Sequence, residues 1–555
     1  MQSIATGFLR RTPRRLVAAC GFRGSASGLS LSSAAMTGED SEMSEFLDYM
    51  ERLKNYERIG VPKGAGMDSD DGFDLGRMRR LLNRLGDPQS HFRAIHIAGT
   101  KGKGSTAAFL SSILREEGYH VGAYSSPHIL TIRERISLGR SGKPVSAKVL
   151  NNLFVEVKVH LDESLKLEKG QLTHFEVFTA LAFALFAKEN VDVAVIEAGL
   201  GGARDATNVL SSNDLAVSII TTIGEEHLDA LGGSLESIAT AKSGIIKCGR
   251  PLVIGGPFDL HIEQILRNQA SSMCSPVVSA CDPGVHGIVK SFGLVDGKPC
   301  QFCDICIQVK TDLELFIELS NIKLRMLGHH QLQNAITATC ASLCLRNQGW
   351  EISNKSIHGG LENTELPGRS QFLTLKEVEA LGLSGVSVLV DGAHTEASAR
   401  ALADTIKIAA ADQQLALVVA MASDKDHVKF ARQLLSGLRP KIVLLTEVSI
   451  AGGNSRMTTA FSLKDAWVNA AAELDIDFLD IGSFKQIIEQ ANPDSLNESV
   501  KDKTTLFIGC EIGPVEDSMK AVHQLLKAGR KEPSGLIVVT GTLHLVSCVL
   551  ASIDQ

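Results

Sequence analysis

Short apolar runs and segments with helical spacing alternate along most of this chain. Residues 94 to 98 form one such run, and a glycine-rich turn and a predicted helix over 105 to 117 follow it. Helical spacing predicts a helix over 175 to 188, which leads into a predicted strand over 191 to 196 and another over 215 to 221. Strands that alternate with helices indicate a parallel sheet covered by helices on both faces.

Some segments depart from this alternation. Helices are predicted over residues 46 to 56 and 75 to 85, with a glycine-rich loop over 60 to 72 between them. Residues 283 to 320 instead alternate apolar and polar positions. This period of two predicts an antiparallel excursion at the edge of the first domain.

A polar, turn-rich segment over residues 361 to 371 follows a predicted helix over 331 to 346 and separates two domains. We expect a first α/β domain over residues 44 to 360, this linker, and a second, smaller α/β domain over 372 to 555. The strands of the second domain are predicted over residues 386 to 390, 415 to 420, 441 to 445, 505 to 508 and 536 to 540.

The N-terminus is rich in arginine and serine, and its first acidic residue is Glu39. This composition is typical of an organelle transit peptide, and no uninterrupted apolar core follows the basic cluster to suggest a secretory signal. We therefore expect residues 1 to 38 to be a transit peptide for the mitochondrial matrix, with the chloroplast, the cytosol or a plain tail as alternatives. The arginines are Arg10, Arg11, Arg14, Arg15 and Arg23.

The composition excludes some classes of protein. The 555 residues include 63 acidic and 56 basic ones, which gives a net charge of −7 and argues against a nucleic-acid-binding protein. No apolar run reaches the roughly 18 residues of a membrane span.

Cys300, Cys303 and Cys306 are too few thiolates for a zinc or iron–sulfur site. In a regular strand Cys300 and Cys306 would share one face, with Cys303 on the other.

The segment from Gly99 to Ser105, Gly-Thr-Lys-Gly-Lys-Gly-Ser, is the strongest sign of chemistry. Its glycines let main-chain N–H groups approach phosphate oxygens, and the following helix N-terminus favours an anion. Lys103 can neutralise the charge of a β- or γ-phosphate. The next residue, Gly104, has no hydroxyl for Mg²⁺, so this ligand must be Ser105, Thr106 or a residue from elsewhere.

Glu197 ends the strand predicted over 191 to 196. Ligands bind at this end of the strands in open α/β sheets, and a carboxylate beside a phosphate loop is a natural ligand of Mg²⁺. The glycines after Glu197 lack the third glycine of a dinucleotide-binding fingerprint. Ser126, His227, Lys242, Arg369 and Asp391 are weaker candidates individually, and their order along the chain adds weight.

These motifs resemble those of the folylpolyglutamate synthase/dihydrofolate synthase family of the Mur-ligase superfamily, from about residue 44 to 545. A departure is Gly541-Thr-Leu-His544, where the family usually has Gly-Ser-Leu-Tyr. The matching motifs are Gly99 to Ser105, Ser125-Ser-Pro-His128, Glu197-Ala-Gly-Leu-Gly-Gly202, Asp205-Ala-Thr-Asn208, His330-Gln-Leu-Gln-Asn334, Leu366-Pro-Gly-Arg369 and Asp391-Gly-Ala-His394.

The resemblance implies an α/β fold in which a P-loop parallel-sheet ATPase domain, like the central domain of Mur ligases, precedes a Rossmann-like domain. It implies an ATP-dependent ligase that forms an acyl phosphate, which the amino group of glutamate attacks. Lys103, Lys242 and His394 are the implied catalytic residues, and Lys242 would be carbamylated. The implied nucleotide-binding residues are Thr100, Lys101, Gly102, Lys103, Gly104, Ser105, Asn334, Arg369 and Asp391.

The resemblance also implies the metal and the other substrates. Ser126, Glu197 and His227 would bind Mg²⁺, two ions being expected, with K⁺ as a further candidate. We expect a monomer with small-molecule partners: ATP, L-glutamate, and 7,8-dihydropteroate or a folate. The residues that match a pterin site are Asp74, Leu75, Gly76, Arg77, Thr173, His174, Phe175, Glu176, Arg204, Asp205 and Ala206.

Three activities remain open at this point. The pterin-site segments favour dihydrofolate synthase over folylpolyglutamate synthase or a bifunctional enzyme, because eukaryotic polyglutamating members typically lack the forms present here. Organelle targeting also suits the monofunctional mitochondrial dihydrofolate synthase of plants. A regulatory protein that binds nucleotide without ligation is the alternative from another class.

Overall fold

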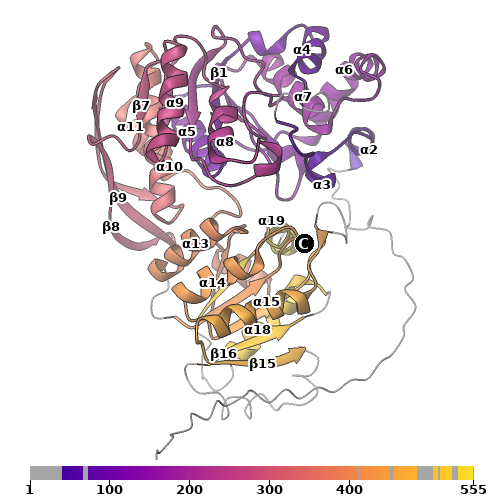
Figure 1. Cartoon of the computed structure of the whole chain (residues 1–555), viewed down its shortest axis with the longest axis vertical. Helices are drawn as coiled ribbons and strands as arrows, with labels where there is room; N and C mark the ends of the chain where they lie inside the picture. Colours follow the sequence, from indigo (N-terminus) through magenta and orange to yellow (C-terminus); the bar gives the residue numbers. More distant parts are fainter. Residues whose placement is uncertain are drawn as a thin grey trace, which may run out of the picture.

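The computed structural model describes residues 41–66, 73–409, 413–450, 456–483, 504–510, 513–527 and 535–553. The transit peptide expected over 1 to 38 and residues 67 to 72 of the glycine-rich loop lie outside these ranges. Two α/β units lie one above the other, the first in indigo to pink and the second in orange to yellow (Figure 1). In the described part of the chain, no helix is both long and apolar enough to cross a membrane.

The first unit is built on a seven-stranded sheet with the strand order β3-β2-β4-β1-β5-β6-β7. All neighbours are parallel except β3, which pairs antiparallel with β2 at one edge. The predicted parallel sheet is therefore confirmed, with one antiparallel edge strand. The strands are β1 (Arg93–Ala98), β2 (Val121–Tyr124), β3 (Ile136–Ser137), β4 (Val193–Glu197), β5 (Leu215–Ile220), β6 (Leu252–Ile254) and β7 (Val277–Ser279).

Helices cover both faces of this sheet. Successive side chains of a strand point to opposite faces, and here the apolar side chains on both faces are buried under helices. Ile95 and Ile97 pack toward α5, α10 and α11, whereas Ala94 packs toward α2, α4, α6 and α7. The helices are α2 (Ser44–Glu51), α3 (Tyr56–Ile59), α4 (Leu75–Arg84), α5 (Lys103–Glu117), α6 (Ala147–Leu167), α7 (His174–Lys188), α8 (Leu235–Ser243), α9 (Leu260–Ser272), α10 (His329–Asn347) and α11 (Asn354–Glu362), with the short turns η1 (Pro88–Ser90), η2 (Ile132–Arg135) and η3 (Leu228–Ala230).

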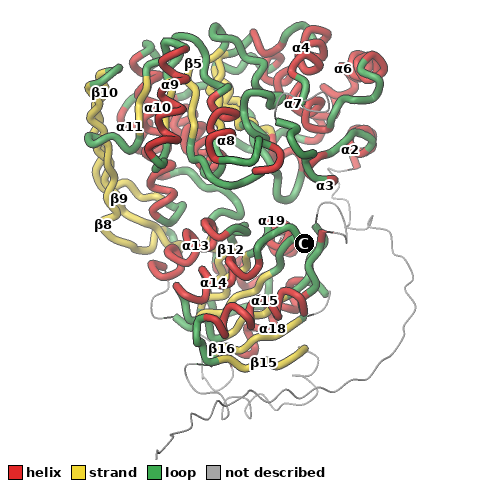
Figure 2. Tube along the Cα trace, viewed as in Figure 1, coloured by secondary structure: helices red, strands yellow, loops and turns green. Residues whose placement is uncertain are grey.

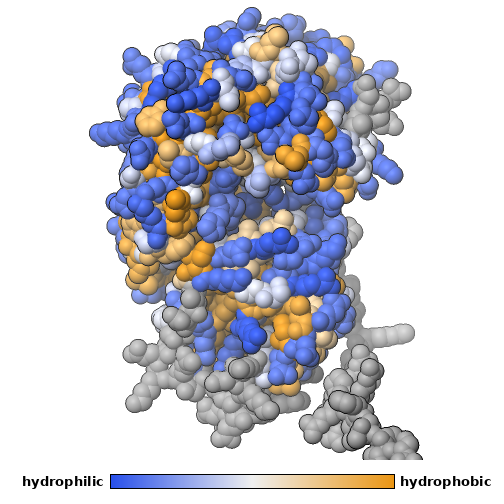
Figure 3. All heavy atoms as spheres, turned by 60° about the vertical axis from the view of Figure 1, so that its left-hand side comes forward, coloured by the Kyte–Doolittle hydropathy of each residue, from blue (hydrophilic) through white to orange (hydrophobic). Residues whose placement is uncertain are grey.

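The predicted antiparallel segment forms β8 (Val285–Val295), β9 (Lys298–Lys310) and β10 (Glu314–Leu324), a separate three-stranded sheet rather than an edge of the first one (Figure 2). One face packs against α10. Figure 3 turns this side of the molecule toward the reader and shows hydrophobic residues, in orange, exposed among hydrophilic ones, in blue. Ile288 and Phe316 of this sheet are exposed.

The strand predicted for the three clustered cysteines is confirmed as β9. Cys303 belongs to the run of alternate buried positions that continues with Ile305 and Ile307, and Cys306, between two of these positions, is half-buried; Cys300 is buried as well. No group of three or more His, Cys, Asp or Glu side chains in the described ranges is arranged to hold a metal ion.

The second unit contains another seven-stranded sheet, with the order β11-β12-β17-β13-β14-β16-β15. Its neighbours are parallel except β11, which pairs antiparallel with β12. Helices α13 to α15 cover one face and α12, α18 and α19 the other. The elements are β11 (Gln371–Phe372), α12 (Leu375–Ala380), β12 (Ser387–Val390), α13 (Glu396–Ala409), β13 (Leu415–Val419), α14 (His427–Gly437), β14 (Ile442–Leu445), α15 (Ala460–Glu473), β15 (Phe478–Ser483), β16 (Thr505–Gly509), α18 (Val515–Lys527), β17 (Leu536–Thr540) and α19 (Leu543–Ile553).

Candidate active site

A cleft of about 3470 Å³ lies between the two units and is lined by residues of both. The loops that follow β1, β4 and β5 open into it from the first unit, and the loop that follows β12 opens into it from the second. These are carboxyl ends of strands, where open α/β sheets bind ligands. All expected nucleotide and metal residues line the cleft except Lys242, which is buried beneath it.

The segment from Gly99 to Ser105 is held by the loop after β5. Lys101 N–H donates to Thr222 Oγ1 (2.9 Å), and Thr221 Oγ1 donates to Lys101 O (2.6 Å). Thr100 N–H donates to Thr222 O (2.7 Å). The loop is therefore shaped by its own chain before any ligand arrives, which lowers the entropy lost on binding.

Gly99 and Gly102 are required by this close packing. Gly102 has φ +86°, and a Cβ on it would lie 2.4 Å from Asn334 Oδ1. A Cβ on Gly99 would lie 1.9 Å from Thr221 Oγ1. Only glycine fits such a left-handed, crowded backbone. Asn334, on α10, thus lies against the loop.

Two lysines approach the same loop. Lys103 Nζ donates to Gly99 O (3.0 Å) and lies 3.9 Å from Glu197 Oε1. Lys242 Nζ donates to Gly99 O from below (2.9 Å). Burial, and then the charge of Lys103, lower the pKa of Lys242 to about 7. The loop therefore combines main-chain donors with cationic side chains, as binding of a polyphosphate requires.

Glu197 ends β4 and is only 5 % exposed. Burial raises its pKa, and Lys103 opposes that effect. Its Oε2 accepts a hydrogen bond from Ser126 N–H (3.2 Å). This hydrogen bond holds the Ser-Ser-Pro-His loop beside the carboxylate.

His227 precedes η3, has φ +57°, and is exposed to the solvent of the cleft although protein surrounds much of its ring. Burial and the charge of Lys242 lower its pKa to about 4, with Glu226 opposing them, so the imidazole is neutral near pH 7. A hydroxyl, a carboxylate and a neutral imidazole around one cleft suit a divalent cation that keeps water ligands. The donor chemistry of Ser126, Glu197 and His227 thus fits Mg²⁺.

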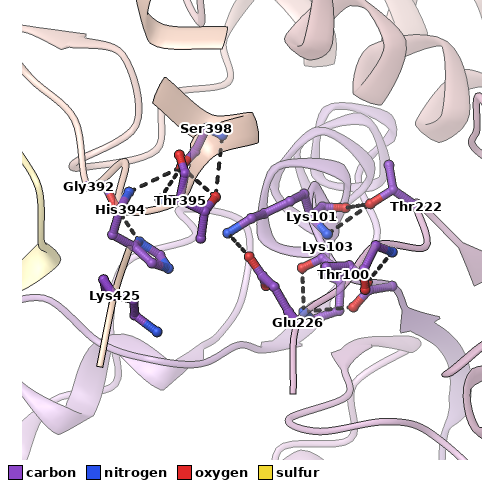
Figure 4. A network of polar contacts seen from close by, with 12 residues as sticks. Thr100, Lys101, Lys103, Thr222, Glu226, Gly392, His394, Thr395, Ser398 and Lys425 are labelled. Carbon is purple, nitrogen blue, oxygen red and sulfur yellow. Dashed lines mark hydrogen bonds and ion pairs between the residues drawn. The ribbon is translucent and has the colours of Figure 1, made fainter. Parts of the chain in front are cut away.

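The second unit faces the phosphate loop with His394 and Lys425 (Figure 4). His394 Nδ1 lies 2.8 Å from Gly392 O, and a carbonyl only accepts, so Nδ1 carries the proton. Burial, followed by the charge of Lys101, lowers the pKa of His394 to about 4. Its Nε2 therefore offers a lone pair. Opposite it, Lys101 forms an ion pair with Glu226.

Arg369 and Asp391 reach the cleft from the linker and from the end of β12. Asp391 accepts hydrogen bonds from Ser370 N–H (2.7 Å) and Ala393 N–H (2.8 Å). The carboxylate thus joins the linker to the turn that carries His394.

The residues expected at a pterin site are divided. Asp74, Thr173, His174, Phe175, Glu176, Arg204, Asp205 and Ala206 line the cleft. Leu75, Gly76 and Arg77 instead lie in the first turn of α4, outside the cleft lining.

Several of these side chains have partners within the fold. Arg77 forms an ion pair with Glu176 (2.8 Å), and Glu176 and Thr173 form the capping box of α7. Asp205 is buried and accepts from Leu200 N–H (2.8 Å), Thr207 N–H (3.0 Å) and Thr207 Oγ1 (2.5 Å). Phe175 stands beside Tyr124, with their ring centroids 6.0 Å apart. Of these residues, Phe175 offers an aromatic wall.

Sequence reasoning missed further charged residues of the cleft, and four of them matter most here: Glu57, Arg135, Glu226 and Lys425. Glu226 is adjacent to His227, which was a usable signal. The other three are brought to the cleft by tertiary contacts that no local pattern encodes.

The sequence of this chain is similar to those of known proteins. Residues 97–342 match the family model of the Mur ligase middle domain. A dihydrofolate synthase/folylpolyglutamate synthase of Bacillus subtilis is 36% identical over 364 residues, covering 65% of this chain and 78% of that protein. A probable dihydrofolate synthetase of Schizosaccharomyces pombe is 32% identical over 68% of this chain and 83% of its own length.

Solved structures share the fold. The folylpolyglutamate synthase of Thermotoga maritima aligns with a TM-score of 0.67 at 28% identity, covering 93% of this chain and 98% of that one. The folylpolyglutamate synthase of Mycobacterium tuberculosis, in complex with ADP and AMPPCP, aligns with a TM-score of 0.70 at 23% identity, over 93% and 99% of the two chains. The chain therefore belongs to the dihydrofolate synthase/folylpolyglutamate synthase family of Mur-type ligases.

Proposed function

We propose that this protein joins L-glutamate to the carboxylate of 7,8-dihydropteroate at the expense of ATP, giving dihydrofolate, ADP and phosphate. Family membership supports an ATP-dependent ligase. The observation that carries the proposal is the cleft, in which the phosphate loop of one unit faces Asp391 and His394 of the other.

The chemistry follows from the leaving group. A carboxylate is a poor acylating agent because it would have to expel an oxide. The carboxylate oxygen attacks the γ-phosphorus, the bond to the β-phosphate oxygen breaks, and an acyl phosphate and ADP form. The glutamate amine then attacks the acyl carbon, phosphate leaves, and the amine loses a proton.

The residues of the cleft have distinct roles in this scheme. Lys103 and the N–H groups of the loop bind and orient the triphosphate. The Nε2 lone pair of His394 can accept a hydrogen bond from the incoming amine and orient it. Arg369, Asp391 and Asn334 complete the nucleotide site, and apposition of the two units excludes water from the acyl phosphate.

Mg²⁺ would neutralise negative charge on the phosphoryl group during its transfer. Ser126, Glu197 and His227 would hold one ion, and carbamylated Lys242 would help to hold a second. K⁺ is a further candidate for the site.

The acceptor is proposed from the pterin-site residues that line the cleft, chiefly Phe175, Arg204 and Asp205. The relatives include proteins named for each activity, one from Schizosaccharomyces pombe as a dihydrofolate synthetase and one from Lacticaseibacillus casei as a folylpolyglutamate synthase. Folylpolyglutamate synthase, alone or in a bifunctional enzyme, is therefore the second candidate.

One experiment separates the candidates. Phosphate release by the purified chain is measured with ATP and glutamate, with 7,8-dihydropteroate or tetrahydrofolate as acceptor. Release with dihydropteroate alone supports dihydrofolate synthase, release with tetrahydrofolate alone supports polyglutamation, and release with both supports a bifunctional enzyme. Nucleotide binding without release in either case would favour a regulatory protein.

We further propose a monomer of the mitochondrial matrix of a plant-type cell. The arginine-rich composition of residues 1 to 38 supports this location. A fluorescent protein fused behind residues 1 to 38 should enter mitochondria; its appearance in chloroplasts or the cytosol would refute the location.

The proposed monomer has its own test. Light scattering should give a mass near 59.4 kDa for the full chain.

A further inference from the structure

The two units are joined directly at α3, the short helix on the side of the first unit that faces the second (Figure 1). Arg456 Nη1 of the second unit donates a 3.0 Å hydrogen bond to the main-chain oxygen of Glu57. Arg456 Nη2 lies 3.5 Å from both carboxylate oxygens of Asp424, which precedes Lys425. Arg456 therefore connects α3 to the loop that presents Lys425 to the cleft.

The side chain of Glu57 makes a second connection, within the first unit. Its Oε2 lies 2.5 Å from Arg135 Nη2. Arg135 is 1% exposed, and a buried guanidinium is costly without a carboxylate partner. Burial raises the pKa of Glu57, but Arg135 outweighs burial and the pKa is lowered. The pair is therefore ionised.

Arg135 in turn holds the loop that carries Ser126. Its Nε donates to His128 Nδ1 (2.9 Å), and its main-chain oxygen accepts from Ser125 N–H (3.0 Å). Because Nδ1 is the acceptor, His128 is neutral with its proton on Nε2. Burial and the charge of Arg135 lower the pKa of His128 to about 3, which agrees. Ser126 N–H meets Glu197 at the other end of this loop.

We propose that Glu57 is a positioning residue for the proposed ligase. Its carboxylate orients Arg135 and hence the loop of Ser126, while its main-chain oxygen anchors the second unit through Arg456. Apposition of the two units and placement of the Ser126 loop are thereby coupled through one residue. This inference rests on the proposed function for its catalytic meaning, while the coupling itself is independent of it.

The first test is a double-mutant cycle on turnover with Arg456→Ala and Glu57→Gln. Each change should lower kcat about tenfold, because Arg456→Ala removes a hydrogen bond from a charged donor and Glu57→Gln removes the charge that pairs with buried Arg135. In the double variant the loss should be clearly smaller than the product of the two single losses, since both changes interrupt one connection. Multiplicative losses would overturn the coupling.

Matched controls and a rescue exclude a general effect on the fold. Arg432→Ala and Glu163→Gln remove exposed charges whose ion pairs lie within one unit, and both should keep kcat within about twofold. Arg456→Lys, which retains one donor, should recover part of the loss. Equal loss in Arg456→Lys and Arg456→Ala, with an unchanged melting temperature, would count against the bond to Glu57.

Amide hydrogen exchange tests the coupling without an activity assay. In Arg456→Ala, amides of residues 125 to 135 should exchange at least about threefold faster than in the wild type, although Arg456 belongs to the other unit. Faster exchange confined to the neighbourhood of residue 456 would refute the coupling. A wild type without glutamate-dependent phosphate release would refute the proposed function instead, so the two failures are distinguishable.

Discussion

Lys242 Nζ donates a 2.9 Å hydrogen bond to the main-chain oxygen of Gly99, 143 positions earlier in the chain. This buried amine supports the first glycine of the phosphate loop from below. The same oxygen also accepts from Lys103, so it keeps one partner when Lys242 is replaced. The effect of replacing Lys242 on folding stability can therefore be measured separately from its effect on turnover.

Lys242→Met should change the free energy of unfolding by no more than about 1 kcal/mol, because one neutral or partly charged donor is exchanged for an apolar chain of similar length. Turnover should fall at least about a hundredfold if Lys242 helps to hold a metal ion. Urea unfolding and phosphate release measure the two effects. Lys247→Met, just beyond the same helix, is the control and should retain turnover; equal turnover in both variants would contradict the role of Lys242.

Lys103→Ala should fold normally and abolish ligation. The side chain is half-buried, and its amine has polar partners in the loop and in Glu197, so its loss removes charge from the phosphate site. Circular dichroism and glutamate-dependent phosphate release measure the outcome, with exposed Lys166→Ala as the control. Wild-type turnover in Lys103→Ala would refute the phosphate-loop assignment.

Gly102→Ala should weaken ADP binding at least about tenfold. The new methyl would lie only 2.4 Å from Asn334 Oδ1, so the loop or the Asn334 side chain would have to shift. Gly86→Ala is a matched control because Gly86 has a similar φ of +81° but open space around its Cβ position. Both variants bear the backbone penalty of about 1–2 kcal/mol. Titration with a fluorescent ADP analogue should show the loss only in Gly102→Ala, and equal losses would discount the contact with Asn334.

The first unit should lose stability in acid through His96. Burial, and then the charge of Lys247, lower the pKa of His96 to about 3, whereas an unfolded histidine titrates near 6.5. Between these values the unfolded chain binds a proton that the folded chain refuses, so stability falls as the pH falls from about 6.5 toward 3. The contribution of His96 to the slope reaches about 1.4 kcal/mol per pH unit.

This slope is measurable because the chain has two tryptophans, Trp350 in the first unit and Trp467 in the second. In a Trp467→Phe background, Trp350 fluorescence reports urea unfolding of the first unit at pH 7 and pH 5. His96→Gln should flatten the difference between the two pH values. An unchanged difference would mean that His96 is not the group that resists protonation.

The sequence predicted those parts of the site that local patterns specify. Residues at the ends of hydrophobic strands, such as Glu197, and the glycines of the phosphate loop were found because strand, loop and helix are contiguous there. The parallel sheets and the antiparallel insertion were also predicted correctly. The division into domains and the roles of the site residues stay predictions.

The sequence-based predictions failed where a feature depends on tertiary contacts or where the hydrophobic periodicity of a helix is weak. The helix predicted over 46 to 56 is divided, because Asn55 caps a new helix by accepting from Glu57 N–H (2.9 Å). Helix α6 was not predicted, and it exposes Val155 and Val159, which obscures its apolar stripe. The contact of Arg456 with Glu57 spans 399 positions and leaves no local signature.

Asp205 has a consequence for how this protein can be probed. Its carboxylate is the shared acceptor of three donors from its own chain, two of them main-chain amides. Alanine at this position would release those donors together and let the turn after β4 unravel. An inactive alanine variant would therefore report a collapsed turn before it reported a lost ligand contact, and only a replacement that still accepts hydrogen bonds, such as asparagine, could separate the two.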